Sequence, residues 1–327
     1  MLSAARQPAI AAFLAANGWA DARRAPLAGD ASARRYERLV RDGERAVLMD
    51  AAAVPDQVAP FLAVGRLLAA AGLSVPTVRA ADPGQALLLL EDFGDQTFTL
   101  LLAEGADPAP LYRLATASLI HLHHHVAPGA TALKRYDIAA WIAIVHLFAE
   151  VYVPRHGRPA DAGELAAFEA IWRALLSPLQ ALPETLVLRD FHAGNLFRLA
   201  GRDGVAACGL IDYQDAGLGC VLYDLISLLE DARRDLDPGI VAACRSQYLA
   251  AFPAIEPGAA DAAWHALALQ RHLRVIAVFD RLAASGDDRY LVHMPRLWAY
   301  VGTHLRALAE PDLNDWLHRH LPAAPWT

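Results

Sequence analysis

Three oxygen-bearing side chains lie close together in this sequence, at a spacing that could support a metal site. Asp190 precedes Asn195 by five residues, and Asp212 directly follows an apolar run. Residues 196–199 and 205–211 are predicted strands, because the segment between them has the glycines and aspartate of a turn. An antiparallel hairpin brings the residue before its first strand next to the residue after its second. Asn195 and Asp212 are therefore expected side by side, with Asp190 on the loop that leads to them.

The chemistry of these three side chains favours Mg²⁺. Carboxylate and amide oxygens are the ligands that Mg²⁺ prefers, and it is usually held by few such groups together with substrate phosphates. Taken singly, each residue is also explained as a turn former. Their joint spacing on one predicted hairpin favours the metal site.

The elements around this hairpin divide the chain into two parts. The first 94 residues alternate strand-like runs with two short helices. These strands are expected at residues 25–27, 36–40, 46–49, 77–80 and 86–90, and the helices at residues 5–16 and 56–71. Long Ala- and Leu-rich helical segments follow, at residues 108–126, 138–153, 162–181, 221–231, 238–251, 259–284 and 289–307. We expect an α+β fold with a small β-rich lobe at residues 1–94 and a large helical lobe at residues 95–327, which contains the hairpin.

Composition limits the partners and the compartment. Of 327 residues, 55% are hydrophobic and 20% charged, which excludes a largely disordered chain. The net charge of −7 provides no general attraction for nucleic acid or anionic lipid, so neither is expected as a partner.

The apolar stretch at residues 138–153 contains His146 and Glu150 and is expected to be a buried helix, too short and too polar to span a membrane. Three cysteines without a C-x-x-C pair fit a reducing compartment. We expect a cytoplasmic protein with no obligate protein partner.

The hairpin region resembles a known enzyme family. The run R-D-F-H-A-G-N at residues 189–195, with I-D-Y at residues 211–213 and Y-D-L at residues 223–225, is similar to the catalytic region of the aminoglycoside phosphotransferase and choline kinase family. The order of elements extends this resemblance over nearly the whole chain. It implies a protein-kinase-like, two-lobed fold and an ATP-dependent phosphotransferase. The usual histidine of the catalytic loop is replaced by Leu188.

The resemblance also assigns roles to the three residues. Asp190 is expected to orient and deprotonate the attacking hydroxyl, while Asn195 and Asp212 hold Mg²⁺ on the ATP phosphates. Phosphoryl transfer requires mainly positioning and charge neutralisation, so this small set of polar groups is chemically sufficient.

The nucleotide-binding part departs from the family pattern. Met49 stands where the family has a phosphate-binding lysine, and the following helix lacks the acidic partner. The phosphate-facing loop at residues 27–36 has a single glycine, yet it is basic. Its expected nucleotide-binding residues are Gly29, Ser32, Arg34 and Arg35. One of the two arginines is expected to supply the missing charge, although the alternative is a solvated turn with surface arginines.

The triplet D-F-G at residues 92–94 spells the metal motif of protein kinases, but it comes before the catalytic loop instead of after it. We interpret it as a hinge, with Glu91 and Phe93 close to the adenine and no metal bound.

The acceptor is expected to meet the helical part of the chain. A polycationic aminoglycoside would need an acidic pocket, whereas the candidate stretches are mixed in charge. The expected acceptor-binding residues are His192, Gln214, Asp215, Arg271 and Arg274. Surface salt bridging is the alternative for the arginines.

Four segments resemble one bacterial subgroup of the family more closely. They are G-D-A-S-x-R-R-Y at residues 29–36, V-L-M-D at 47–50, I-D-Y-Q-D-A at 211–216 and L-Q-R-H-L at 269–273. This subgroup also lacks the strand lysine, and it phosphorylates the anomeric 1-hydroxyl of N-acetylmuramate or N-acetylglucosamine in peptidoglycan recycling. The lactyl carboxylate of N-acetylmuramate would explain a basic pocket. Two alternatives remain: a kinase of an aminoglycoside, choline or a homoserine-like alcohol, or a catalytically silent kinase-like binding module.

Overall fold

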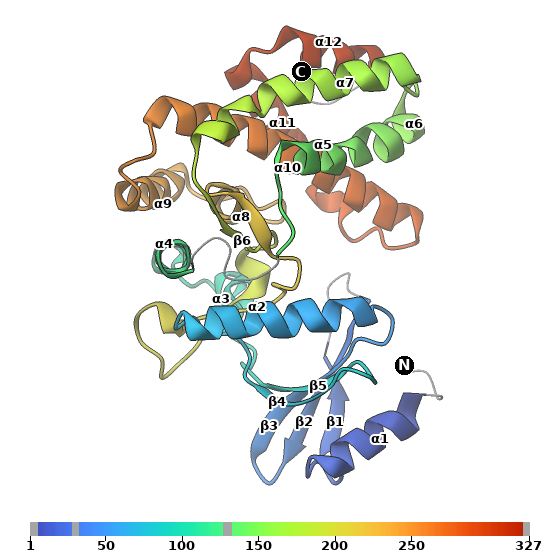
Figure 1. Ribbon diagram of the computed structural model, residues 1–327, viewed down its shortest axis with the longest axis vertical. Coiled ribbons are helices and arrows are strands. Elements are labelled where there is room, and N and C mark those ends of the chain that lie inside the picture. The colour runs from blue at the N-terminus through green and yellow to red at the C-terminus, as the bar shows by residue number, and fades with distance from the viewer. Residues whose placement is uncertain (1–5, 28–32, 127–132, 323–327) are drawn as a thin grey trace. The chain divides into compact units, whose positions relative to one another are not determined.

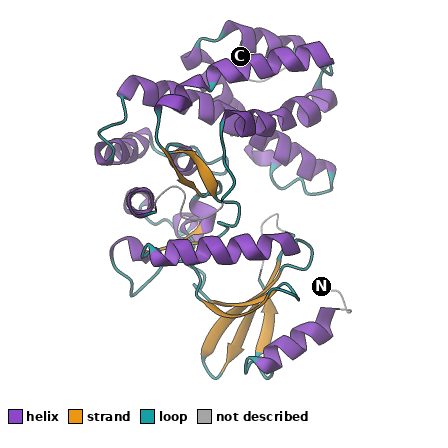
Figure 2. Ribbon diagram, viewed as in Figure 1, coloured by secondary structure: helices purple, strands orange, loops and turns teal. Residues whose placement is uncertain are grey.

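The computed structural model describes residues 6–27, 33–126 and 133–322, which fold into two compact units. The first unit comprises the described residues up to Asp107 together with Ala193–Asp215, and the second comprises the other described residues. Strands dominate the first unit, whereas the second is almost entirely helical (Figure 2). The expected α+β class is confirmed. The expected boundary after residue 94 stays a prediction, because the two units group segments by packing and not by their order along the chain.

A five-stranded antiparallel sheet organises the first unit, with the strand order β1-β2-β3-β5-β4. Its strands are β1 (Arg23–Pro26), β2 (Arg35–Arg41), β3 (Glu44–Asp50), β4 (Val78–Asp82) and β5 (Leu87–Glu91). Asp42 and Gly43 join β2 to β3 with positive φ angles of 48° and 82°, as a tight hairpin turn of this type requires. All five strands were predicted, from strand-like and short apolar runs with turn signals between them.

The two faces of this sheet have different neighbours. Helix α1 (Gln7–Ala16) covers one face, where its apolar side chains pack against Leu39, Ala46, Leu48 and Leu87 in one buried cluster (Figure 1). Successive residues of a strand point to opposite faces. Tyr36, Val47 and their cross-strand partners therefore point to the other face.

Helix α2 (Val58–Ala70) follows the third strand. Its buried residues Phe61, Val64 and Leu68 recur at helical spacing and form one apolar stripe. The helix stops at Gly72, whose φ of 80° suits the left-handed position after a helix end. The first unit also contains α3 (Phe98–Ala103), β7 (Leu196–Arg198) and β8 (Cys208–Leu210).

The second unit is built around the 28-residue helix α10 (Pro257–Ala284), which packs against α5, α8 and α11. Its other helices are α4 (Pro108–His125), α5 (Ile138–Leu147), α6 (Val153–His156), α7 (Ala162–Leu175), α8 (Tyr223–Leu229), α9 (Pro238–Ala251), α11 (Met294–Leu308) and α12 (Pro311–His320). A short antiparallel pair, β6 (Glu184–Val187) and β9 (Gly217–Cys220), lies among them. The side chains of Trp141 and Tyr223 are buried and stacked, with ring centroids 4.4 Å apart.

The apolar segment predicted at residues 138–153 is longer than expected. It is helical over Ile138–His156 and passes through a π-helical turn at Phe148–Tyr152, so Pro154 does not end it. A π turn accommodates the missing proline N–H. These 19 residues are long and apolar enough to cross a membrane by length and composition, so the prediction that the segment is too short and polar was wrong. Within the unit, Trp141, Val145 and Phe148 are fully buried, and 39% of the apolar window is buried in all, so the expected burial holds for one side of the helix.

Candidate active site

The predicted hairpin is present and brings two candidate metal ligands together. Strands β7 and β8 pair antiparallel, with Leu196 opposite Leu210. The amide of Ile211 then donates to the carbonyl of Asn195 over 3.1 Å, which continues the pairing beyond the strands. Asn195 and Asp212 are therefore neighbours at one end of the hairpin, as the sequence predicted.

The second strand of this hairpin is shorter than predicted. Gly204–Ala207 form a 3-10 helix instead of a strand. The hydroxyl of Ser74 donates to the carbonyl of Ala206 over 2.6 Å, and the carbonyl of Ser74 accepts from the amide of Leu210 over 2.8 Å. Ser74 thus bonds to Ala206 before the strand and to Leu210 within it, while the carbonyl of Ala207 accepts from the amide of Leu199, directly after β7, over 2.9 Å.

Asp212 is held in an unusual conformation. Its φ of 63° lies in the left-handed region, which few residues other than glycine adopt. Its carboxylate forms an ion pair with Arg34 and accepts from Nε2 of Gln214 over 3.1 Å. Arg34 also donates to Oε1 of Gln214 over 2.7 Å. The Asp212 side chain keeps 33% of its surface exposed, so the carboxylate remains accessible.

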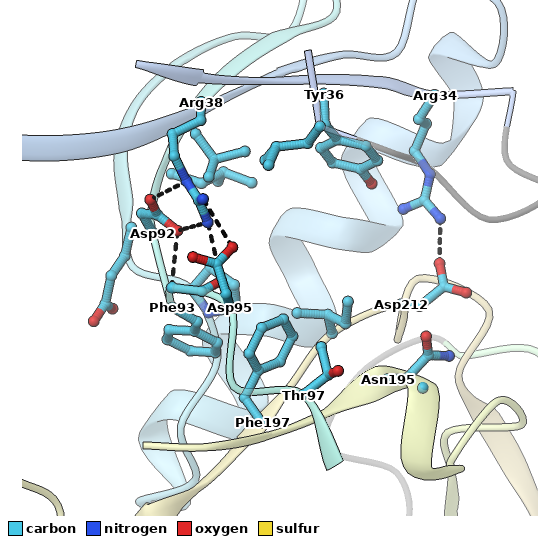
Figure 3. A pocket seen from close by; sticks show the side chains of 18 of the residues that line it. Arg34, Tyr36, Arg38, Asp92, Phe93, Asp95, Thr97, Asn195, Phe197 and Asp212 are labelled. Atoms are coloured by element: carbon cyan, nitrogen blue, oxygen red, sulfur yellow. Dashed lines mark hydrogen bonds and ion pairs between the residues drawn. The ribbon is translucent and has the colours of Figure 1, made fainter. Parts of the chain in front are cut away.

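A cavity of about 360 Å³ lies within the first unit, and both candidate ligands line it. One part of its wall is apolar and aromatic and could enclose a flat ring: Leu27, Val47, Phe61, Pro76, Leu90, Phe93, Phe197 and Ile211. Figure 3 shows Arg34 with Asp212 on one side of the cavity, Arg38 with two carboxylates on the other, and Tyr36 between them. Burial raises the pKa of Tyr36 to about 12, so its hydroxyl stays protonated and can donate a hydrogen bond. A flat apolar half and a polar half suit a nucleotide.

Arg38 fixes the segment that follows β5. Its guanidinium lies 2.7 Å from the carboxylate of Asp92 and 2.8 Å from that of Asp95, and it donates to the carbonyl of Gly94 over 3.0 Å. Arg38 was not among the site residues expected from the sequence, although an arginine in the strand-like run at residues 36–40 was a usable signal. Asp92 is thus engaged by Arg38, and the interpretation of D-F-G as a hinge stays a prediction.

Glu91 and Phe93, the expected adenine-binding residues, both line the cavity. The carboxylate of Glu91 is occupied by other partners, because it accepts from the hydroxyl of Thr77 over 2.9 Å and pairs with Arg202. Phe93 presents its ring to Phe197 in an edge-to-face contact, with centroids 5.7 Å apart. Phe93 can therefore contact a ring in the cavity, whereas the Glu91 side chain is engaged in holding the hinge.

The expected phosphate loop is described in part. Gly29 and Ser32 lie outside the described residues. Arg34 is buried and lines the cavity, whereas Arg35 is exposed and is not one of the lining residues. Met49 lies opposite Tyr36 on the neighbouring strand and is completely buried. The position at which the family's lysine is expected is thus closed to solvent.

Asp190 lies in the second unit, where the backbone before it is fixed by Asp224. The two oxygens of Asp224 accept from the amides of Leu188, over 2.6 Å, and Arg189, over 2.9 Å. Arg189 has a φ of 75°, a conformation that needs such support. Burial raises the pKa of Asp224 to about 7, against the effect of the two amide donors, which favour the charged form. The loop that carries Asp190 is therefore held by hydrogen bonds to its backbone.

The expected acceptor-binding residues belong to both units. Gln214 and Asp215 lie in the first unit, and His192, Arg271 and Arg274 in the second. His192 is buried, and burial lowers the pKa of its imidazole despite the nearby charge of Asp231. Arg271 is buried too, and it donates to the hydroxyl of Ser227 over 2.9 Å, which links α10 to α8. A common acceptor site for the five residues stays a prediction.

A second polar cluster, which the sequence analysis did not identify, lies buried among α8, α10 and α11. One carboxylate oxygen of Glu230 is 2.8 Å from Nε2 of His272 and 2.8 Å from Nε2 of His304, while Trp264 donates to the other oxygen over 2.7 Å. The three residue types could hold a metal ion. Two N–H donors on one carboxylate oxygen account for the same geometry by hydrogen bonding alone.

Comparison with known proteins identifies sequence relatives. The sequence model of a family described as "Phosphotransferase enzyme family" matches residues 23–262. A protein of Caulobacter vibrioides named N-acetylmuramate/N-acetylglucosamine kinase is 38% identical, and the alignment covers 98% of each chain. A protein of Pseudomonas aeruginosa with the same name is 33% identical over 88% of this chain and 86% of its own length.

Solved structures show the same fold at low identity. A choline/ethanolamine kinase family protein from Mesorhizobium loti has a TM-score of 0.63 and 16% identity, covering 98% of this chain and 99% of its own. An ADP-bound aminoglycoside phosphotransferase has a TM-score of 0.60 and 15% identity, covering 92% of this chain and 99% of its own. The predicted protein-kinase-like fold is thereby confirmed.

Proposed function

The chain belongs to the phosphotransferase enzyme family, and from this premise we propose that it transfers the γ-phosphoryl group of ATP to the 1-hydroxyl of N-acetylmuramate or N-acetylglucosamine. The observation that carries the proposal is the relative of Caulobacter vibrioides, which is named for these two sugars and aligns along the full length of both chains at 38% identity. The reaction would belong to the recycling of peptidoglycan sugars in the cytoplasm and would need no obligate protein partner.

The residues of the hairpin end fit a phosphate-bound Mg²⁺. Asn195 and Asp212 offer amide and carboxylate oxygens next to each other, both line the cavity, and the Asp212 carboxylate is accessible. Mg²⁺ held there would neutralise charge on the phosphates during transfer. Arg34 lies beside this carboxylate and adds a fixed positive charge. Of the loop residues Gly29, Ser32, Arg34 and Arg35, we therefore assign the main phosphate contact to Arg34, and we assign Phe93 to the adenine.

Asp190 is the proposed general base. Its carboxylate would accept the proton of the sugar 1-hydroxyl while that oxygen bonds to the γ-phosphorus and ADP leaves. Asp224 would support it by holding the preceding backbone. Acceptor contacts are assigned to His192, Gln214, Asp215, Arg271 and Arg274, with the arginines suited to the lactyl carboxylate of N-acetylmuramate.

The test is a kinase assay on the full chain with Mg²⁺, ATP and a panel of N-acetylmuramate, N-acetylglucosamine, kanamycin and choline. We expect ADP release with the two sugars and a phosphate on C1 in the product, identified by NMR. Preference for kanamycin or choline would favour the other small-molecule kinases. If the protein binds nucleotide but turns over none of the acceptors, the result would favour the catalytically silent binding module.

Asp190→Asn tests the base in the same assay. Loss of a general base slows transfer by about 10²–10⁴-fold, so we expect the rate to fall at least a hundredfold while ADP affinity stays within twofold. Asp203→Asn, at an exposed aspartate of the hairpin, is the matched control and should keep the wild-type rate. An Asp190→Asn variant that retains more than half of the rate would remove Asp190 from this role.

A further inference from the structure

Helix α2 carries a glycine at a position that contacts an aromatic ring. A Cβ added at Gly65 would lie 2.9 Å from the hydroxyl oxygen of Tyr213 and 3.4 Å from its Cε2. Glycine is among the least favourable residues in the interior of a helix. Helix formation therefore does not explain the glycine, whereas the close approach of Tyr213 does, because a larger residue would collide with it.

The ring of Tyr213 is enclosed on two sides by α2. It stacks on Phe61, with centroids 4.9 Å apart and an interplanar angle of 20°. Phe61 and Gly65 are four residues apart and so lie on the same face of the helix. The Tyr213 side chain is almost fully buried, so it cannot leave this notch without disturbing the helix.

Tyr213 directly follows Asp212, whose backbone is in the left-handed region with a φ of 63°. Such a conformation persists only where the surroundings determine it from several sides. Arg34 and Gln214 hold the carboxylate of Asp212, and the enclosed ring of Tyr213 holds the backbone on its C-terminal side.

We propose that the notch formed by Phe61 and Gly65 is a positioning device for the metal site: it fixes Tyr213 and thereby keeps the Asp212 carboxylate facing the cavity. Gly65, Phe61 and Tyr213 are positioning residues, since they act through Asp212. The inference rests on the proposed function, because it takes Asp212 as a ligand of the nucleotide-bound metal.

Gly65→Ala tests this proposal through ligand binding. The added methyl group displaces Tyr213 and shifts Asp212, so we expect Mg²⁺–ADP to bind at least tenfold more weakly in calorimetry. Affinity for ADP without metal should stay within twofold, since Phe61, the apolar lining residue on which Tyr213 stacks, keeps its place on α2. Helix propensity alone predicts the opposite: a higher melting temperature and unchanged Mg²⁺–ADP binding. That result would overturn the proposal.

A second substitution distinguishes the contact between the added methyl group and the Tyr213 hydroxyl from a general loss of stability. Tyr213→Phe removes the hydroxyl, and the nearest remaining ring atoms lie 3.4 and 3.5 Å from the added Cβ, which is about normal contact. The double variant Gly65→Ala/Tyr213→Phe should recover Mg²⁺–ADP affinity to within threefold of wild type. Failure to recover while the double variant is folded would contradict the notch. The control Ala69→Gly changes an exposed position of the same helix and should lower the melting temperature without affecting the metal response.

The outcomes also distinguish this inference from the proposed function. If wild-type protein phosphorylates the sugars and Gly65→Ala binds Mg²⁺–ADP normally, the positioning inference alone is wrong. If wild-type protein fails to bind Mg²⁺–ADP, both are wrong. Should Gly65→Ala not fold, Tyr213→Leu replaces it, since leucine keeps apolar volume but loses the stack on Phe61. Normal Mg²⁺–ADP affinity of Tyr213→Leu would then overturn the proposal.

Discussion

Arg34 and Arg35 are neighbours in the sequence, yet their side chains have different surroundings. Arg34 and Tyr36 both line the cavity, as alternate residues of an extended segment should, whereas Arg35 is exposed. The sequence left open which arginine supplies the charge missing at Met49. The geometry favours Arg34, which already contacts the candidate ligand Asp212.

Alanine variants of the two arginines test this choice. Arg34→Ala should lower kcat/KM for ATP by roughly ten- to a hundredfold, because a charge-assisted hydrogen bond contributes about 1.5–3 kcal/mol. Arg35→Ala is the matched control and should remain within about twofold of wild type, as expected for an exposed side chain. Both are measured with saturating sugar. Equal losses, or a normal value for Arg34→Ala, would contradict the assignment.

The family pattern suggests that a lysine at position 49 would raise activity, whereas the structure predicts that it would not. Met49 is completely buried opposite Tyr36, so Met49→Lys would place an ammonium group in an apolar site without a carboxylate partner on α2. Burying a charge in this way costs several kcal/mol. We expect a lower melting temperature and no gain in kcat/KM for ATP. An increase in kcat/KM would show instead that the lysine site is open and that Arg34 does not replace it.

At the scale of elements, local signals were enough for the sheet and most helices. Asp42-Gly43 identified the turn between β2 and β3, and Gly72 identified the end of α2. The hairpin of β7 and β8 followed from two apolar runs around a glycine-containing turn. This hairpin is also why the relation of Asn195 to Asp212 was predictable, since pairing geometry alone places them together.

Elements that depend on distant partners were missed. Strand β6 pairs with β9, more than 30 residues further along the chain, and Gly217 and Gly219 give β9 little strand propensity of its own. Helix α12 was missed for a different reason. Its buried residues Leu313, Trp316, Leu317 and His320 follow a clear helical spacing, which the sequence analysis did not use.

His272, which hydrogen-bonds to the buried Glu230, makes the stability of the second unit depend on pH. Burial lowers the pKa of His272 from 6.5 to about 4, although the hydrogen bond to Glu230 opposes this. Between pH 6.5 and about pH 4, His272 is protonated in the unfolded chain but neutral in the folded chain. The free energy of unfolding therefore decreases on acidification.

Urea unfolding at pH 7.5 and pH 5 measures this effect. His272 should account for about 2 kcal/mol of the loss in unfolding free energy between the two. His272→Gln keeps an N–H donor for Glu230 but does not titrate, so its loss should be smaller by this amount. An identical loss in both proteins would assign the acid sensitivity to other groups.

At the scale of the whole molecule, the cavity is assembled from segments that are far apart in the sequence. Arg34 and Arg38, the segment around Phe93, and the hairpin residues Asn195 and Asp212 belong to the same compact unit although up to 178 residues separate them. A motif search could find the hairpin and the D-F-G triplet separately. Their assembly around one cavity depends on tertiary packing, and so does the place of Arg38, whose partners lie more than 50 residues away.

This distribution predicts where a bound nucleotide should protect the chain. Mg²⁺–ADP at saturating concentration should slow amide hydrogen exchange in residues 34–38, 91–97, 194–197 and 211–214, because ligand binding stabilises the segments that contact it. Helices α7 and α12 of the second unit carry none of the cavity residues and should exchange as in the free protein. At the same ligand concentration, Asp212→Ala should lose most of the protection conferred by Mg²⁺–ADP but retain the weaker effect of ADP alone. Protection confined to the second unit, or spread equally over α7 and α12, would show that the nucleotide does not bind in this cavity.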